Sequence, residues 1–254
     1  STKQEQQELL NIVIVGGGAT GIEVAGILSE MKKFVLPNDY PDMPSSLMHI
    51  YLIEAGPRLL AGMSEESSAH AEQFLREMGV NILLNKRVVD YRDHKVVLED
   101  GTEIATRTFI WVSGVTGVTI GNLDASLIGR GGRIKVDSFN RVEGMNNVFA
   151  IGDQCIQLAD ENYPNGHPQL AQVAIQQGEL LAKNLVRMEK GREMKPFHYR
   201  NLGSMATVGR NRAVAEFSKV KMQGWFAWVM WLVVHLRSIL GVRNKVIVLL
   251  NWVW

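Results

Sequence analysis

The sequence predicts an α/β fold that continues into an apolar helical tail, and three observations support this prediction. First, a run of β-branched residues, Asn11–Val15, leads directly into a glycine-rich turn and a helical pattern. Second, another apolar strand, His49–Ile53, follows that helix. Third, five of the six tryptophans lie within the last thirty residues. Short buried strands that alternate with helices are typical of a parallel sheet.

The remaining elements of the first half follow from local patterns. Residues 4–10 are interpreted as the end of a helix or a linker, and residues 22–33 as the helix after the glycine turn. Three prolines between residues 34 and 48 predict a loop or an insertion there. Residues 64–78 have a helical pattern, and residues 80–84 a strand pattern.

The second half begins with shorter strand patterns. Residues 95–104 carry an Asp-Gly turn between two of them, which is typical of a β-hairpin. Residues 108–112 and 147–151 are predicted as strands, and residues 169–188 as a helix. A segment with β-propensity, residues 205–217, comes before the apolar tail.

Composition narrows the class of protein. The 254 residues suffice for one large domain or two smaller ones, and 46% hydrophobic residues exclude a disordered chain. A net charge of +1 argues against a general nucleic-acid binder. The single cysteine, Cys155, excludes an intrachain disulfide and any redox mechanism that uses a cysteine pair of this chain. We expect no metal site, and residues 1–10 have no signal-peptide pattern.

The glycine-rich turn has the spacing Gly16-x-Gly18-x-x-Gly21 between a strand and a helix. In this context the first glycine permits the tight turn, and the second lets the backbone approach a pyrophosphate. The third lets the helix pack close to the strand. The N-terminus of the helix attracts phosphates through its free N–H groups and its dipole. We therefore predict dinucleotide binding by these glycines together with Thr20.

Glu54 follows the second strand, where an acidic side chain binds the adenosine ribose hydroxyls. A carboxylate there repels a 2′-phosphate, so NAD is favoured over NADP. The distance from the glycines exceeds the usual spacing of about 20 residues, and the insertion at residues 34–48 accounts for the excess. The alternative is a glycine turn of another α/β protein with a glutamate there by chance.

Several longer segments resemble a known family. Residues 12–26, Trp111–Val115 and Val148–Gln154 resemble signatures of flavoprotein oxidoreductases with two dinucleotide-binding folds. Three more segments narrow the resemblance: AQVAIQQG at 171–178, GSMATVG at 203–209, and GVRNKV at 241–246 with Asn251-Trp252. Together they are similar to type II NADH dehydrogenases, the single-subunit NADH:quinone oxidoreductases that do not pump protons. The resemblance extends from about residue 9 to residue 254.

The resemblance implies three regions: a Rossmann-like NAD(H)-binding domain at residues 9–115, the C-terminal part of an FAD-binding domain at 116–192, and a membrane-anchoring region at 193–254. It also implies hydride transfer from NADH to FAD, and electron transfer from there to a membrane quinone. Family members begin with an FAD-binding glycine motif that this sequence lacks. We therefore expect a fragment whose FAD site is incomplete.

The resemblance also assigns roles to individual residues. Glu23 is expected to be catalytic, facing the nicotinamide and the flavin; the alternative is a solvent-exposed glutamate at a helix start. Ser113 and Gly114 are expected to pass close to the nicotinamide, although the family more often has alanine than serine there. Asp153 is expected to bind a ribityl hydroxyl of the flavin; the alternative is a helix N-cap.

Gln172 and Gln176 are spaced i,i+4 and therefore share one helix face. The resemblance implies that they line a slot for the quinone head group, with amides that donate to its carbonyl oxygens. Without the resemblance, two glutamines on a helix would be read as solvated. His167 and Cys155 are assigned to structure, because neither has partners for metal binding or disulfide chemistry.

The tail predicts contact with a membrane. Residues 225–234 form an apolar run that is too short to span a bilayer, which takes about 20 residues. No acidic residue follows Glu216, whereas five lysines and arginines do. Such a segment suits the membrane interface. We predict a peripheral (monotopic) protein at the cytoplasmic face of a bacterial inner membrane, with these contact residues: Trp225, Trp228, Trp231, Arg237, Arg243 and Trp252.

Other functions remain open at this point. The tail is alternatively a core helix or a dimer interface, and a homodimer is compatible with either assignment. A soluble FAD/NAD-dependent disulfide or ferredoxin reductase would share the glycine turn. A non-enzymatic NAD-binding module that dimerises through its tail belongs to a different class. The tail and the segment at residues 171–178 argue against the soluble reductase.

Overall fold

The computed structural model describes residues 3–118, 120–218, 220–239 and 241–253, with only the backbone of residues 3–4, 238 and 251–253. The chain divides into two compact units. Unit 1 combines residues 1–113 with residues 203–254, and unit 2 comprises residues 114–202. The C-terminal region thus joins the first unit, although it is distant in sequence. The three regions inferred from the family resemblance remain a prediction.

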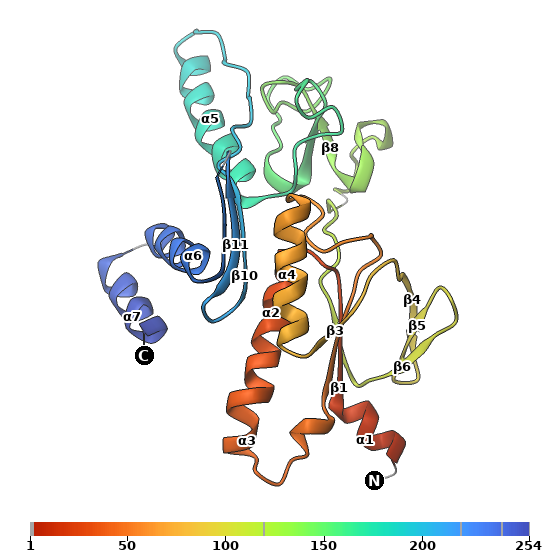
Figure 1. Ribbon diagram of the computed structural model, residues 1–254. Helices are drawn as coiled ribbons and strands as arrows, with labels where there is room; N and C mark the ends of the chain where they lie inside the picture. Colours follow the sequence, from red (N-terminus) through yellow and green to blue (C-terminus); the bar gives the residue numbers. More distant parts are fainter. Residues whose placement is uncertain (1–2, 119, 219, 240, 254) are drawn as a thin grey trace. The chain divides into compact units, whose positions relative to one another are not determined.

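Unit 1 is built on a parallel sheet of four strands, β1 (Asn11–Val15), β2 (His49–Ile53), β3 (Val80–Leu83) and β7 (Thr108–Trp111) (Figure 1). The strand order is β3-β2-β1-β7, and all neighbours are parallel. All five residues of β1 are buried, as their apolar character requires at the centre of such a sheet. The predicted α/β fold with a Rossmann-like sheet is confirmed.

Helices α2 (Ala19–Glu30) and α4 (Glu65–Glu77) follow β1 and β2, and α1 (Lys3–Leu10) precedes the sheet. Ser64 caps α4 by accepting a hydrogen bond from Ser67 N at 3.3 Å. Residues of α2, α4 and the sheet share one core. The predicted helices at 22–33 and 64–78 are confirmed in kind, with ends that differ by a few residues.

The predicted loop at residues 34–48 is wrong in its first part. After α2 the chain continues as the π-helix η1 (Met31–Val35) and the short helix α3 (Leu36–Asp39); the 3-10 turn η2 (Ser45–Leu47) follows. Pro37 lies in the first turn of α3, where its missing N–H is tolerated.

Along the sequence, a separate small antiparallel sheet comes between β3 and β7. It consists of β4 (Val88–Arg92), β5 (Lys95–Leu98) and β6 (Glu103–Ala105). The turn from β5 to β6 contains Asp100 and Gly101, and Gly101 has a φ of +83°. This is the left-handed conformation that favours glycine. The predicted hairpin at residues 95–104 is confirmed.

The C-terminal part of unit 1 is an antiparallel sheet of β10 (Ser204–Gly209), β11 (Arg212–Phe217) and β12 (Val220–Gln223), followed by α6 (Gly224–Ser238) and α7 (Val242–Val253). Ala206, Val208 and Val214 pack into the core with α2 and α4. Ala213 and Ala215 pack against Ala227 of α6 instead. Since side chains alternate along a strand, α2 and α6 cover opposite faces of this sheet.

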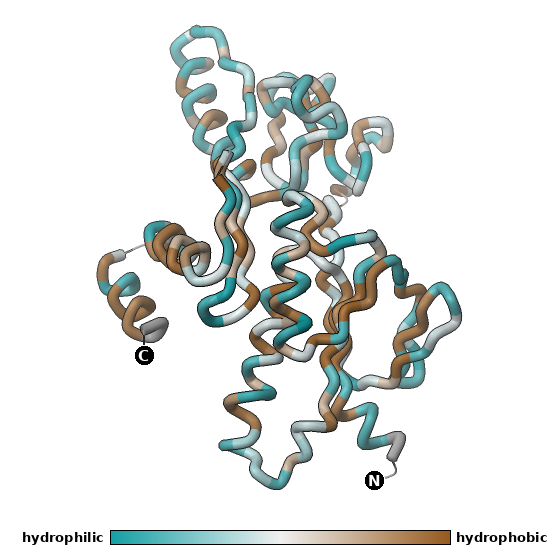
Figure 2. Tube along the Cα trace, viewed as in Figure 1, coloured by the Kyte–Doolittle hydropathy of each residue, from teal (hydrophilic) through white to brown (hydrophobic). Residues whose placement is uncertain are grey.

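Helices α6 and α7 are mostly hydrophobic along their length (Figure 2). Even so, none of the helices among the described residues combines the length and the apolar character needed to cross a bilayer.

Unit 2 has little regular structure besides helix α5 (Ala171–Glu189). The other regular elements described in unit 2 are two short parallel strands, β8 (Ile134–Val136) and β9 (Cys155–Gln157), and three 3-10 turns, η3 (Ala125–Leu127), η4 (Arg130–Gly132) and η5 (Gly152–Gln154). The predicted helix at 169–188 is confirmed. The predicted strand at 147–151 is wrong, because Phe149 forms only an isolated bridge with Arg141.

Candidate functional site

Two glycines of the turn after β1 are required by the fold of unit 1. Gly16 has a φ of +117°, and a Cβ atom there would lie 3.0 Å from the backbone of Ser113. A Cβ on Gly21 would lie 1.8 Å from the carbonyl oxygen of Gly16. Side chains at these two positions would therefore prevent the turn and the close approach of α2 to β1.

Gly18 differs from these two glycines, because a Cβ atom at this position would meet nothing within 4 Å among the described residues, apart from its neighbours along the chain. Gly18 is the N-cap of α2, and no side chain caps that end among the described residues. Residues 18–20, including Thr20, are exposed. The helix therefore presents an open, positively polarised N-terminus, which is the arrangement that binds phosphate groups.

Glu54 lies beside this turn and is held by two main-chain N–H groups. Its Oε2 atom accepts a hydrogen bond from Gly17 N, and its Oε1 atom accepts one from Gly56 N, both at 2.6 Å. A carboxylate has about four lone-pair sites, so each oxygen can accept a further hydrogen bond from a ribose hydroxyl. The half-buried carboxylate, the open position at Gly18 and the exposed helix end together fit the adenosine half of NAD.

Because the position at Gly18 is open, a substitution there can test NADH binding with little effect on folding. We expect Gly18→Ala to lower the stability of the protein by about 1 kcal/mol, because alanine is a poorer N-cap residue than glycine but its methyl group would meet no obstacle. The same methyl group would occupy the space through which a pyrophosphate approaches, so the Kd for NADH should rise about ten-fold, which corresponds to ~1.4 kcal/mol. Urea denaturation and titration of NADH fluorescence would measure the two effects. An unchanged Kd would contradict the assignment.

Glu23 lies in the first turns of α2 and contacts β10 of the same unit. Its Oε1 atom accepts hydrogen bonds from Thr207 Oγ1 at 3.2 Å and from Thr207 N at 3.4 Å. Thr207 lies in the GSMATVG segment, but no sequence pattern indicates that it contacts Glu23. The catalytic role of Glu23 remains a prediction. The structure adds that Thr207, in the C-terminal sheet, holds this carboxylate by hydrogen bonds.

Ser113 and Gly114 lie where the chain passes from unit 1 to unit 2. Trp111 Nε1 donates a hydrogen bond to the carbonyl oxygen of Ser113 at 3.0 Å. Gly114 has a φ of +77°, a conformation that favours glycine. Both residues are exposed, as an approach of backbone to a ligand requires, and their proximity to the nicotinamide remains a prediction.

Asp153 lies in η5 of unit 2 and is exposed. It caps no helix, since the N-cap of η5 is Ile151 and that of α5 is Leu170. The turn itself is fixed by Gln177, whose Oε1 atom accepts a hydrogen bond from Gly152 N at 2.7 Å. Gln177 is buried, and sequence reasoning missed it in favour of its neighbour Gln176.

Gln172 and Gln176 both bind the segment that follows α5 in unit 2. Gln176 accepts a hydrogen bond from Arg200 N at 3.1 Å and donates one to the carbonyl oxygen of Arg200 at 2.9 Å. Gln172 Oε1 accepts one from Leu202 N at 3.0 Å. These amides therefore have a structural task that the sequence did not predict. Since an amide NH2 group has two donors, Gln176 keeps one N–H beyond the bond to Arg200.

A buried hydrogen-bonded pair, His167 and Asp160, lies in unit 2. His167 Nε2 donates to Asp160 Oδ2 at 2.9 Å, and this hydrogen bond lowers the pKa of Asp160. Rings of Tyr163, Phe197 and Tyr199 surround the imidazole, with centroids 5.1 to 5.9 Å away. The aromatic enclosure fits the structural assignment of His167.

Cys155 and Arg133 complete the core of unit 2. Arg133 donates to the carbonyl oxygen of Cys155 at 2.6 Å and to that of His167 at 3.1 Å. Burial raises the pKa of the Cys155 thiol, which makes it less reactive. No cluster of three or more metal-ligating side chains occurs within the described parts of the chain.

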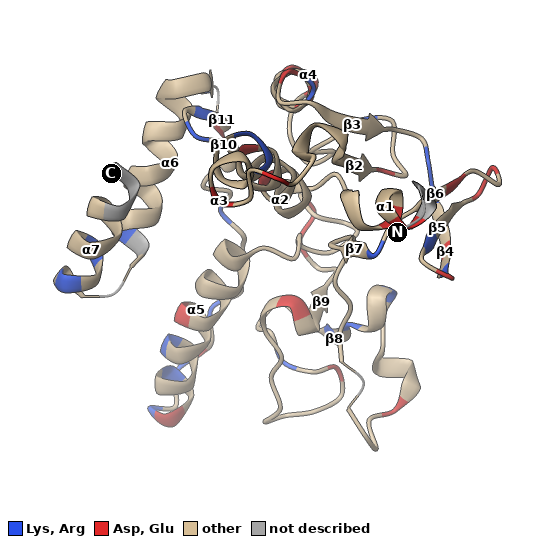
Figure 3. Ribbon diagram, turned by 90° about the horizontal axis from the view of Figure 1, so that it is seen from below, with Lys and Arg blue, Asp and Glu red and all other residues tan. Residues whose placement is uncertain are grey.

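The residues predicted to contact a membrane lie on α6 and α7. Trp225 is exposed, and so are Arg237 and Arg243. Trp228 is partly buried and packs with the alanines of β11 and α6. Trp231 stacks on His235 at 3.9 Å between ring centroids. The side chain of Trp252 lies outside the described residues. Figure 3 shows basic but no acidic residues on these helices.

Comparison with known proteins identifies the family. Residues 1–178 match the family model described as pyridine nucleotide-disulphide oxidoreductase. The chain belongs to this family. Residues 201–254 match a second model, described as the NDH2 C-terminal domain. Together these two matches confirm the resemblance of the chain to type II NADH dehydrogenases.

Individual relatives agree with these family matches. The chain is 35% identical to the type II NADH:quinone oxidoreductase NdhA of Mycobacterium tuberculosis, over 98% of this chain and 54% of that protein. It is 32% identical to the mitochondrial internal alternative NAD(P)H-ubiquinone oxidoreductase A1 of Arabidopsis thaliana, over 98% and 52%. The chain thus spans about half the length of these relatives.

Solved structures share the fold. The structure of NDH2 from Plasmodium falciparum in complex with NADH has a TM-score of 0.88 at 19% identity, covering 100% of this chain and 67% of that one. A ferredoxin reductase from Rhodopseudomonas palustris has a TM-score of 0.57 at 17% identity, covering 84% and 48%.

Proposed function

We propose that this chain is part of a type II NADH:quinone oxidoreductase, which passes a hydride from NADH to FAD and then electrons to a membrane quinone. The observation that carries this proposal is the presence of both family matches on one chain, residues 1–178 and 201–254. The names of the relatives from Mycobacterium and Arabidopsis support it.

Unit 1 would bind the NAD(H) in this proposal. The open position at Gly18 and the exposed N-terminus of α2 would accept the pyrophosphate, and Glu54 would accept hydrogen bonds from the adenosine ribose. Because Glu54 is a carboxylate, a 2′-phosphate would be repelled and NADH preferred over NADPH. Glu23, fixed by Thr207, would lie beside the nicotinamide, and Ser113 and Gly114 would approach the nicotinamide through their backbone.

Unit 2 would supply the flavin and quinone contacts. FAD, when bound, accepts the hydride and releases electrons singly or in pairs. The exposed carboxylate of Asp153, on a turn fixed by Gln177, would accept a hydrogen bond from a ribityl hydroxyl. Gln172 and Gln176 would line the quinone slot, where Gln176 would donate its second N–H and hold the wall formed by residues 200–202.

The C-terminal helices would dock peripherally on a membrane. Exposed Trp225 and the basic residues Arg237 and Arg243 are suited to the headgroup region, and no acidic residue opposes them after Glu216. We propose that this surface lies at the cytoplasmic face of a bacterial inner membrane, because some of the relatives are bacterial and NADH is produced in the cytoplasm. A homodimer is also compatible with this surface.

The test is an assay of the full-length polypeptide that carries this sequence. We expect bound FAD, NADH oxidation that depends on an added quinone, and at least about ten-fold lower kcat/KM with NADPH, corresponding to ~1.4 kcal/mol. A soluble ferredoxin or disulfide reductase would instead reduce ferredoxin or a disulfide substrate. NADH binding without any electron transfer would support a non-enzymatic module. Either of these two results would overturn the proposal.

A further inference from the structure

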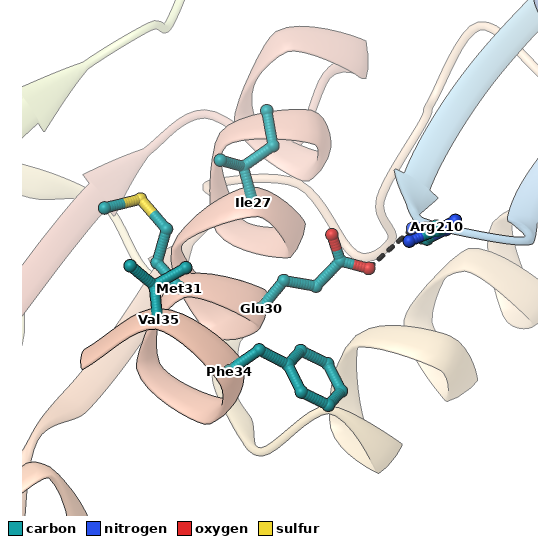
Figure 4. A pocket seen from close by; sticks show the side chains of 6 residues that line it. All are labelled: Ile27, Glu30, Met31, Phe34, Val35 and Arg210. Carbon is teal, nitrogen blue, oxygen red and sulfur yellow. Dashed lines mark hydrogen bonds between the residues drawn. The ribbon is translucent and has the colours of Figure 1, made fainter. Parts of the chain in front are cut away.

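An apolar stripe on unit 1 remains exposed where α2 continues into η1. It consists of Ile27, Met31, Phe34 and Val35, whose spacing places them on one helical face. Ile27 is 55% exposed and Phe34 59%. Together with Glu30 and Arg210 they line a pocket of about 410 Å³ (Figure 4). Such a face is normally buried in a soluble protein.

Contacts along α2 fix where the stripe lies. Successive turns of α2 contact successive residues of β10. Glu23 meets Thr207, and Gly26 approaches Val208 so closely that a Cβ atom would lie 1.8 Å from its carbonyl oxygen. Glu30 then accepts a hydrogen bond from Arg210 N at 2.5 Å. Because Arg210 lies in the turn between β10 and β11, η1 extends beyond that end of the sheet.

The start of α6 lies at the same end of this sheet. Gln223, the last residue of β12, pairs with Val214 near the beginning of β11. Helix α6 begins at the next residue, and its first turn exposes Trp225 (54%) and Phe226 (73%). The apolar stripe and the first turn of the proposed membrane helix therefore occur at one end of the β10–β12 sheet.

The basic residues beside the stripe favour binding to an anionic surface. Lys33 Nζ lies 5.1 Å from the centroid of the Phe34 ring, and Arg210 is exposed at the rim of the pocket. The carboxylate of Glu30 is engaged by the main-chain N–H of Arg210. Exposed aromatic and aliphatic side chains flanked by cations are typical of segments that lie in the headgroup region of a bilayer.

We propose that this stripe, with Lys33 and Arg210, is a second contact with a bilayer containing anionic phospholipid, in addition to the C-terminal helices. The proposal rests on the membrane docking proposed above. We infer that a lipid surface covers the stripe. The stripe and Trp225 lie at the same end of the β10–β12 sheet, and the exposed cations Lys33 and Arg210 flank the stripe.

The single cysteine makes a direct test feasible. Cys155 is 1% exposed, so a thiol-reactive, polarity-sensitive NBD label should react with a cysteine introduced by Phe34→Cys and spare the native one; the labelled wild type checks this. We expect a blue shift and at least a roughly two-fold rise in NBD emission when vesicles of phosphatidylcholine and phosphatidylglycerol are added. Pure phosphatidylcholine vesicles should give a smaller change.

Two further labelled variants separate the outcomes. Val89→Cys, at an exposed residue (56%) of β4, should give no change, and Trp225→Cys should respond as the proposed tail does. A response at 225 without one at 34 would overturn the second contact and leave the docking of the tail intact. No response at either position would overturn both. A blue shift at 34 that grows with protein concentration in the absence of vesicles would assign the stripe to a second copy and overturn the proposal.

Discussion

Gly26→Ala is expected to destabilise unit 1 by about 3 kcal/mol, the upper part of the usual range for overpacking. The added Cβ atom would lie 1.8 Å from the carbonyl oxygen of Val208 and 2.6 Å from its carbonyl carbon. Both are backbone atoms of β10, so relief requires α2 and the C-terminal sheet to separate. The same separation would withdraw Thr207 from Glu23.

The expected loss of stability is informative because it is opposite in sign to the usual effect of this substitution. Glycine to alanine within a helix normally stabilises by about 0.5–1 kcal/mol, because it reduces the entropy of the unfolded chain. Gly178 in α5 is the matched control, since its Cβ atom would make an ordinary contact at 3.7 Å with Ile151. Thermal and urea unfolding should show a loss for Gly26→Ala and a gain for Gly178→Ala. A stabilised Gly26→Ala would show that α2 does not pack on β10 in this way.

The elements predicted well were those whose signal is local. Asn11–Val15 is apolar throughout because it is buried on both faces, and the strand could be recognised without its partners. The hairpin at residues 95–104 was recognisable from one Asp-Gly turn. The position of Glu54 followed from the end of the second strand, and the structure places its carboxylate at the glycine turn.

What the sequence could not predict depends on contacts between distant residues. Nothing near Gly26 indicates that a strand 180 residues later passes over it, or that Thr207 hydrogen-bonds to Glu23. The helical path beyond residue 33, through Val35 and α3, escaped prediction because prolines suggest a break, although a proline in the first turn of a helix is tolerated. Predicting the strand at 147–151 failed for the opposite reason: its apolar pattern is real, but only Phe149 finds a bridge partner among the described residues.

In unit 2 the resemblance selected Gln172 and Gln176, whereas the buried amide is that of Gln177. Helical spacing identifies a face, but it does not say which face is buried. Gln177 fixes the turn that carries Asp153, whereas the partly buried Gln172 and Gln176 hydrogen-bond to Leu202 and Arg200. The turn of Asp153 and the side chains of Gln172 and Gln176 are therefore each held by hydrogen bonds that only the folded chain creates.

Asp160→Asn is expected to destabilise unit 2 by about 2 kcal/mol at neutral pH, because a hydrogen bond to a charged group contributes about 1.5–3 kcal/mol. The carboxylate of Asp160 is buried and accepts a hydrogen bond from His167 Nε2 at 2.9 Å. An asparagine amide is uncharged, so it accepts a weaker hydrogen bond from the imidazole. Because Arg133 and the rings of Tyr163 and Tyr199 also contact His167, loosening the pair should loosen the loop that leads into α5.

The pH dependence of this loss has a definite sign. The hydrogen bond from His167 lowers the pKa of Asp160 below its ordinary value of about 3.9. A carboxyl group with a lowered pKa contributes stability that is complete above its unfolded pKa and disappears as the pH falls through its folded pKa. The difference between wild type and Asp160→Asn should therefore be constant from pH 7 to about pH 5 and shrink below about pH 4. Urea denaturation at several pH values would measure it. A difference that stays constant down to pH 3 would mean that the ionised carboxylate is not the source of the stability, and that the variant acts through packing alone.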